Sequence, residues 1–164
     1  MDDVLQTILD LMKATINDNS TQIKTFYKGK VNSEVVPMDY LPALMIYGNS
    51  TSVSALSTCK DQYVYDITIK LVDNLKNYMS TSGVDETIKH QEAMYNLVED
   101  RETTGVLKAD TVLGILRSNI RTAKWLNNND IDIDYTIVPS EAGNFWRIEC
   151  DINLIATTDI LSRP

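Results

Sequence analysis

Four carboxylates between residues 130 and 141 have the spacing that comes nearest to a known chemistry. Asp130, Asp132, Asp134 and Glu141 match positions 1, 3, 5 and 12 of a calcium-binding loop, in which oxygens wrap a hard cation. Position 6 of such a loop is a glycine, which permits the sharp turn, but here it is Tyr135. The isoleucines between the aspartates alternate as strand residues do. The polar face of a strand therefore explains these carboxylates better, and we predict no metal and no other cofactor.

Other arrangements that support catalysis are missing from the sequence. It has no glycine-rich phosphate loop, no Gly-x-Ser-x-Gly elbow, no paired histidines and no dinucleotide-binding fingerprint. The only histidine, His90, lies two positions from Ile88 and faces away from the apolar side of its expected helix. A catalytic imidazole needs an orienting partner, and none is suggested nearby. We predict that the protein is not an enzyme.

Length and composition indicate one soluble domain over residues 1–164. The chain is 43% hydrophobic and 23% charged, and a chain of this size buries enough surface for a core without disulfides. Cys59 and Cys150 are far apart and are expected to be reduced thiols. No stretch approaches the ~18 apolar residues of a membrane span. We therefore predict no membrane contact, and a protein that is made and kept in the cytoplasm or is built into a particle there. The net charge of −8 argues against binding to nucleic-acid phosphates.

The longest two-residue period in the sequence lies between residues 61 and 72, and it predicts the central strand of a sheet. Tyr63, Tyr65, Ile67, Ile69 and Leu71 face one side, and polar residues face the other. Three further strands are expected, over 22–31, 43–48 and 131–137, and a last one over 145–157. The last two should pair as an antiparallel hairpin. Residues 49–58, rich in serine and threonine, are expected to form a flexible loop or hairpin arm.

Three helices complete the expected fold, over residues 3–17, over 85–99 and from Asp110 onward to Asn127. We therefore predict an α+β domain, with a mostly antiparallel sheet of about four or five strands packed against about three helices. Gly114 should weaken the third helix by roughly 1 kcal/mol relative to alanine. Arg117, Arg121 and Lys124 line one side of that helix, either as a solvated face or as a basic stripe that meets an acidic neighbour.

In its order of elements the chain resembles the tail terminator and tail-completion proteins of long-tailed bacteriophages, also called head–tail joining proteins. The likeness rests on Leu41-Pro-Ala-Leu-Met-Ile-Tyr47, on the strand from Tyr63 to Val72 that leads into the helix 85–99, and on the closing hairpin that ends in Phe145-Trp-Arg-Ile-Glu-Cys-Asp-Ile-Asn-Leu-Ile-Ala156. It spans nearly the whole chain. These families have no diagnostic catalytic motif.

The resemblance implies a structural virion protein that forms a ring, usually a hexamer, at the head-proximal end of the tail tube. Such a ring ends tube polymerisation and joins the tail to the head or neck, after assembly in the host cytoplasm. Its partners are other copies of itself, the tail tube protein and a neck or connector protein. DNA passes through without specific binding. Asp132, Asp134, Glu149 and Asp151 on the closing hairpin are candidates for an acidic face toward the channel.

Within the ring, contacts between copies are head to tail, so the stripe of Arg117, Arg121 and Lys124 would meet a different, acidic surface on the next copy. Three alternatives remain open from the sequence. One is a neck or connector-completion ring on the portal side. The second, from a different class, is a monomeric domain that binds calcium or a small ligand, which predicts stabilisation by that ligand rather than self-association. The third is an enzyme whose site is assembled only in the folded chain.

Overall fold

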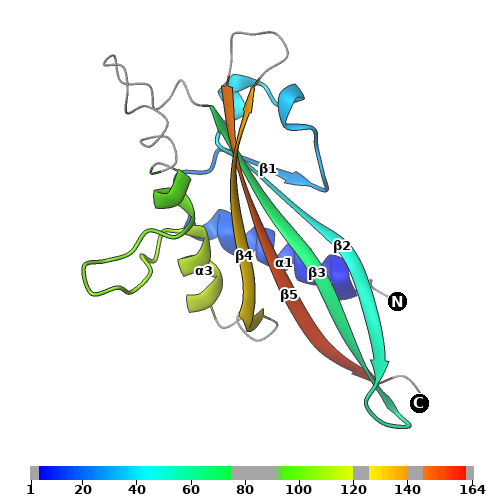
Figure 1. The fold of residues 1–164 in the computed structure, drawn as a ribbon. Helices are drawn as coiled ribbons and strands as arrows, with labels where there is room; N and C mark the ends of the chain where they lie inside the picture. The colour runs from blue at the N-terminus through cyan, green and yellow to red at the C-terminus, as the bar shows by residue number, and fades with distance from the viewer. Residues whose placement is uncertain (1–3, 75–91, 93, 120–125, 140–145, 162–164) are drawn as a thin grey trace, which may run out of the picture.

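A computed structural model describes residues 4–74, 92, 94–119, 126–139 and 146–161 (Figure 1). Within these residues the chain has the predicted α+β fold, in which helices pack on a five-stranded sheet. Residues 94–98 are also helical, and two short 3-10 turns occupy Ser33–Val35 and Met38–Tyr40. The remaining elements are α1 (Val4–Asn19), β1 (Thr25–Lys28), β2 (Ala43–Ala55), β3 (Lys60–Asn74), α3 (Val112–Ser118), β4 (Leu126–Pro139) and β5 (Trp146–Leu161).

The sheet has the strand order β1-β2-β3-β5-β4, so β3 is central, as its period predicts. β1 runs parallel to β2, and every other neighbouring pair is antiparallel. The predicted closing hairpin is confirmed, because β4 pairs with β5 and Asp134 lies opposite Asp151. β5 is the last strand along the chain, yet it lies between β3 and β4.

One face of the sheet carries the main hydrophobic core. The inward side chains of β3 and β5 alternate with polar ones, and they pack under α1, residues 94–98 and α3. Each large aliphatic side chain that becomes fully buried stabilises the fold by about 1.5–3 kcal/mol. The most deeply buried members include Ile8, Met12, Ile16, Ile67, Ile69, Leu71, Met94, Ile115, Leu116 and Ile152.

A second, smaller core lies on the opposite face at one end of the sheet. There Val36 and Leu41 cover Ala43, Met45 and Val72. The start of β2 is therefore buried on both faces, which explains its uninterrupted apolar run. The covering segment is held to β5 by the guanidinium of Arg147, whose Nη2 donates to the carbonyl oxygen of Val36 at 2.7 Å. The rest of this face has no such cover among the described residues.

The boundaries of several elements differ from those predicted. β2 continues to Ala55, so of the two expectations for residues 49–58 the hairpin arm is right and the flexible loop is wrong, and only residues 56–59 turn the chain. The first strand is shorter than 22–31 and spans Thr25–Lys28. α3 begins after an N-cap at Thr111 rather than Asp110, and it ends at Ser118 because Asn119 is extended. Residues 127–130, expected to end that helix, belong to β4.

The chain folds tightly against the first turn of α3. The Thr111 hydroxyl accepts from the Gly114 N–H at 3.1 Å and donates to the Lys108 carbonyl oxygen at 2.8 Å. A Cβ on Gly114 would lie 2.0 Å from that carbonyl oxygen. Gly114 is thus required by close backbone approach, and the expectation that it merely weakens a helix interior is wrong.

Tyr135 of β4 connects the sheet to the segment that follows the helical residues 94–98. Its hydroxyl donates to Glu99 Oε1 at 2.7 Å. Burial, together with this hydrogen bond, raises the pKa of Tyr135 above its ordinary value of 10.0. Because the folded pKa is the higher one, the contribution of Tyr135 to stability is present below pH 10.0 and is lost as the pH rises above it.

We expect Tyr135→Phe to lower the free energy of unfolding by about 1–2 kcal/mol at neutral pH, because Glu99 loses its donor. The variant should also lose less stability than the wild type between neutral pH and pH values above 10.0, since one group with a raised pKa is gone. Urea unfolding at several pH values measures both effects. Tyr40→Phe, at an exposed tyrosine, is the matched control and should change neither. Equal losses in the two variants would contradict the role of the Glu99 contact.

Candidate functional site

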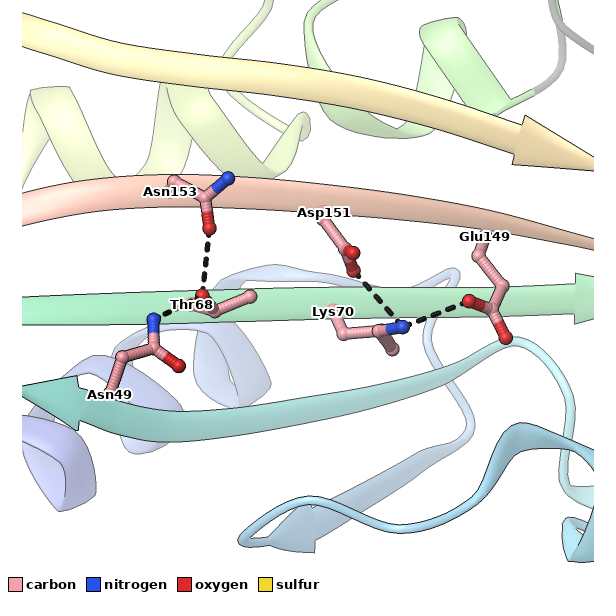
Figure 2. Close-up of polar contacts among 6 residues, drawn as sticks. All are labelled: Asn49, Thr68, Lys70, Glu149, Asp151 and Asn153. Carbon is pink, nitrogen blue, oxygen red and sulfur yellow. Dashed lines mark hydrogen bonds and ion pairs between the residues drawn. The ribbon is translucent and has the colours of Figure 1, made fainter.

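The face of the sheet opposite α1 carries a continuous set of polar side chains. It begins where the second core ends and extends along β3, with neighbours from β2, β5 and β4. Figure 2 shows six of these side chains, on β2, β3 and β5. Alternation along each strand places these side chains on one side because their neighbours in sequence are buried under the helices. We call this surface the polar face. Its members are Asn49, Asp66, Thr68, Lys70, Asp132, Asp134, Glu149, Asp151 and Asn153.

Lys70 is the centre of the charges on the polar face. Its Nζ lies 2.8 Å from Glu149 Oε2 and 3.4 Å from Asp151 Oδ1 (Figure 2). The side chains of Lys70 and Glu149 are only 15% and 12% exposed. Burial by itself favours the neutral amine, but the hydrogen bond to Glu149 and the charges of both carboxylates outweigh it and raise the pKa of Lys70. Lys70 therefore stays charged and holds two carboxylates together on β5.

A hydrogen-bonded row beside Lys70 joins three strands. Asn49 Nδ2 of β2 donates to Thr68 Oγ1 at 2.7 Å, and Thr68 Oγ1 donates to Asn153 Oδ1 of β5 at 2.7 Å (Figure 2). Asn49 is the residue left unpaired where the register between β2 and β3 shifts. Such a bulge redirects a side chain, and here the amide of Asn49 reaches the polar face. The row ties β2 and β5 to β3 next to the second core.

The four predicted acidic residues lie on one surface, but two of them are paired with a lysine and two are exposed. Glu149 and Asp151 are paired with Lys70, whereas Asp132 and Asp134 on β4 are exposed. Asp132 and Asp66 line a shallow hollow with Asn153, Leu154 and Ile155. Asp132 and Asp134 on β4 therefore carry exposed negative charge on the polar face, whereas the charges of Glu149 and Asp151 on β5 are partly neutralised by Lys70.

Of the predicted basic stripe, the structure describes only Arg117. Arg117 is exposed in the last turn of α3. The helix ends at Ser118, because Asn119 has the extended backbone angles φ −88° and ψ 117°. Arg121 and Lys124 lie outside the described residues, as do His90 and most of the helix expected over residues 85–99.

The strand geometry disfavours the calcium loop. Asp132 and Asp134 lie two positions apart on a regular strand, so both point to the same side instead of wrapping an ion. Glu141 lies outside the described residues. Within the described part of the chain, no three histidine, cysteine or acidic side chains are grouped so that they could hold a metal. Burial raises the pKa of the Cys150 thiol, and Cys59 is exposed in the turn between β2 and β3.

A projecting arm is the second candidate surface, and its extent was not predicted. It consists of residues 50–55 of β2, 60–64 of β3 and 157–161 of β5, beyond the point where β4 last pairs at Ala156. Figure 1 shows this three-stranded ribbon extending past the helices to the turn that joins β2 and β3. All side chains of its β2 strand are exposed. In the sequence, serine alternates with other small residues over 50–55. This alternation is the only sign of a strand there, because it contains no repeating apolar position.

No helix among the described residues is long and apolar enough to cross a membrane. The sequence matches no protein-family model and no curated protein. The function therefore has to be inferred from the polar face and the arm.

Proposed function

We propose that this protein is a structural virion subunit that forms a ring, a hexamer, at the head-proximal end of a phage tail tube, where it ends tube polymerisation and joins the tail to the head or neck. The observation that carries the proposal is the arm. It is a ribbon of three strands that has little core of its own and presents backbone and small side chains to solvent. Long exposed strands of this kind gain stability when a neighbouring chain covers them.

The order of elements supports the same role. The strand that begins Ala43-Leu-Met-Ile-Tyr47, the central β3 and the closing β4–β5 hairpin are the segments on which the resemblance to tail terminators and tail-completion proteins rests. A ring subunit needs a compact core, two lateral surfaces and a surface toward the channel. The helix-covered sheet supplies the core. The arm is available for the lateral contacts between copies, and the polar face is available for the surface toward the channel.

The charge distribution fits a channel through which DNA moves without binding. The net charge is −8, and Asp132 and Asp134 are exposed on the polar face. Carboxylates that face a channel repel nucleic-acid phosphates. Lys70 does not offset this repulsion, because its charge is already held by Glu149 and Asp151.

Native mass spectrometry and negative-stain microscopy of the purified protein at micromolar concentrations test the ring. We expect a closed ring whose mass is a whole multiple of 18.5 kDa, six copies for the hexamer of the proposal, and the same particle with and without calcium. A strict monomer at every concentration up to the solubility limit would contradict the proposal. A monomer that calcium stabilises would replace it with a ligand-binding role.

The orientation of the polar face is tested in the same particles. Asp132→Lys combined with Asp134→Lys should leave the ring intact but make it retain double-stranded DNA at low salt, with retention lost as salt rises. Asp10→Lys combined with Asp18→Lys, at exposed positions of α1 on the opposite side of the sheet, is the matched control and should bind less DNA. Equal DNA binding by both variants would contradict a channel lined by the polar face.

A further inference from the structure

Within the described part of the chain, both outer edges of the arm are open. β1 covers β2 only as far as Ile46, which pairs with Lys28. From Tyr47 to Ala55 no described strand pairs with the outer side of β2. On the other side of the ribbon, β4 pairs with β5 up to Ala156 and no described strand continues beyond it. Two rows of backbone donors and acceptors therefore face away from the ribbon.

The hydrogen-bond pattern identifies the residues that present these rows. The Leu56 N–H donates to the Lys60 carbonyl oxygen at 2.9 Å, and in an antiparallel pair the direction of the backbone groups alternates with each residue. Ser52 and Ser54 therefore face β3, while Thr51 and Val53 face the open edge of β2. The same alternation carried across β3 leaves Thr157 and Asp159 facing the open edge of β5.

The open edge of β2 lacks the features that keep edge strands from pairing. Natural proteins protect exposed edges with lysine or other charges, with proline or by keeping them short. Residues 47–55 contain no charged residue and no proline. β4, the other edge strand, carries the exposed Asp132 and Asp134, and the short β1 ends in the exposed Lys28. Only the β2 edge combines length with neutral side chains among the described edges.

The strand directions decide which partner satisfies both edges. β2 and β5 are each antiparallel to β3, so they run in the same direction. Rotation about a ring axis would place the β2 edge of one copy beside the β5 edge of the next, as a parallel pair. A two-fold dimer would instead pair β2 with β2 and leave β5 open in both copies. The ring satisfies both open edges of the arm, whereas the dimer leaves the β5 edge open.

We infer that the β2 edge of the arm, residues 47–55, binds the β5 edge of the arm in a neighbouring copy, residues 157–161, so that the arms form one continuous sheet around the ring. The inference rests on the proposed ring and adds the surface through which copies join. Main-chain hydrogen bonds supply the contact, as in other cases where a strand is added to a sheet edge.

Cysteine cross-linking tests the pairing in chains with Cys59→Ser, in which only the buried Cys150 remains. Val53 and Thr158 both lie opposite Tyr63 in the register, so they share a level and a face of the ribbon. One chain carries Val53→Cys and the other Thr158→Cys. On mild oxidation of co-expressed chains we expect disulfide-linked pairs that each contain one of the two variants.

Two outcomes would overturn the inference. A disulfide between two copies of the Val53→Cys chain would indicate the two-fold dimer. A ring seen by native mass spectrometry without any disulfide between the two chains would show that copies join elsewhere, and the proposed function would stand without this interface. A strict monomer, in contrast, would remove the ring itself.

A charge on the edge gives an independent measurement. Val53, which is 54% exposed, can be replaced by lysine without disturbing the core. Val53→Lys should move ring formation to at least about tenfold higher protein concentration. Gln62→Lys adds the same charge to the central strand of the arm and should leave assembly unchanged. Thermal unfolding of the two variants at low concentration checks that both are folded, and equal assembly by both would overturn the inference.

Discussion

Replacing Gly114 with alanine should lower the free energy of unfolding by about 2–3 kcal/mol, although alanine is the better helix former. The added methyl group would lie 2.0 Å from the Lys108 carbonyl oxygen and 2.8 Å from Thr111 Oγ1. That carbonyl oxygen is fixed, because it accepts from both the backbone N–H and the hydroxyl of Thr111. The helix or the preceding turn would have to move. Urea unfolding measures the loss as a lower midpoint with an unchanged slope.

Ser118→Ala is the matched control for Gly114→Ala. It adds an alanine to the exposed last residue of the same helix, where only a 3.4 Å hydrogen bond to the Ile115 carbonyl is lost. Its effect should stay within about 0.5 kcal/mol. A Gly114→Ala protein as stable as the wild type would contradict this prediction. It would show that the turn before α3 can move at little energetic cost and that helix propensity determines the effect of the substitution on stability.

Replacing Lys70 with methionine should lower the free energy of unfolding by about 2–3 kcal/mol, because two carboxylates on β5 would lose their shared cation. Glu149 is 12% exposed, so water can replace only part of the lost interaction. Asp151 also lies opposite Asp134 in the register, and the repulsion between the two carboxylates would be left uncompensated. Methionine keeps the length of the side chain, so that the change reports charge more than packing.

A double-mutant cycle isolates this charge effect. In a Glu149→Gln background, Lys70→Met should cost less than in the wild type, and the difference measures the coupling of the pair. Lys28→Met is the matched control, since Lys28 and Asp10 form a pair at 3.4 Å with side chains 59% and 53% exposed. Its cost should be no more than about 1 kcal/mol. Equal costs at Lys28 and Lys70 would contradict a special role for the buried pair.

Lys70→Met should also change how the free energy of unfolding depends on pH. The pKa of Lys70 is raised above its ordinary value of 10.5, so its contribution to stability is present below that pH and is lost as the pH rises through the folded pKa. The Lys70→Met protein should lack this part of the alkaline loss. Comparing the two proteins by urea unfolding at neutral pH and above pH 10.5 would show the difference.

The predictable part of the fold was the part in which burial leaves a period in the sequence. Ile67, Ile69 and Leu71 alternate with polar residues because one face of β3 lies under the helices. The helix over 3–17 was recognisable for the same reason, since Ile8, Met12 and Ile16 face the core. The hairpin of β4 and β5 followed from two alternating runs joined by a short segment.

The features that the sequence does not predict depend on strand pairing and on close backbone approach, neither of which leaves a hydrophobic pattern in the sequence. Residues 50–55 are exposed on both faces, so their strand conformation comes from pairing with β3 and not from a hydrophobic pattern. Gly114 looked like a weak point of a helix because the approach of the Lys108 carbonyl is set by the turn before it. The third helix is predicted too long because apolar residues continue past Ser118 in the sequence, whereas Asn119 already has an extended backbone.

The polar face likewise has features that the sequence predicts and features that it does not. The sequence placed Glu149 and Asp151 on the polar side of β5, and alternation alone was enough for that. It did not place Lys70 between them, because the contact depends on the register of two strands that are far apart in the chain. The shared face of Asp132 and Asp134 was predictable, whereas their difference in exposure from Glu149 was not.

The position of β5 inside the sheet also constrains how the protein folds during synthesis. β3 pairs with β5 from Lys60–Leu161 to Asn74–Arg147, and β4 pairs with no described strand except β5. Until β5 has been synthesised, β3 has one unpaired side and β4 has no described partner. Non-local pairing of this kind slows folding and exposes strand edges in the meantime. The local β2–β3 hairpin can form earlier. β5 then completes the sheet by pairing with β3 on one side and with β4 on the other.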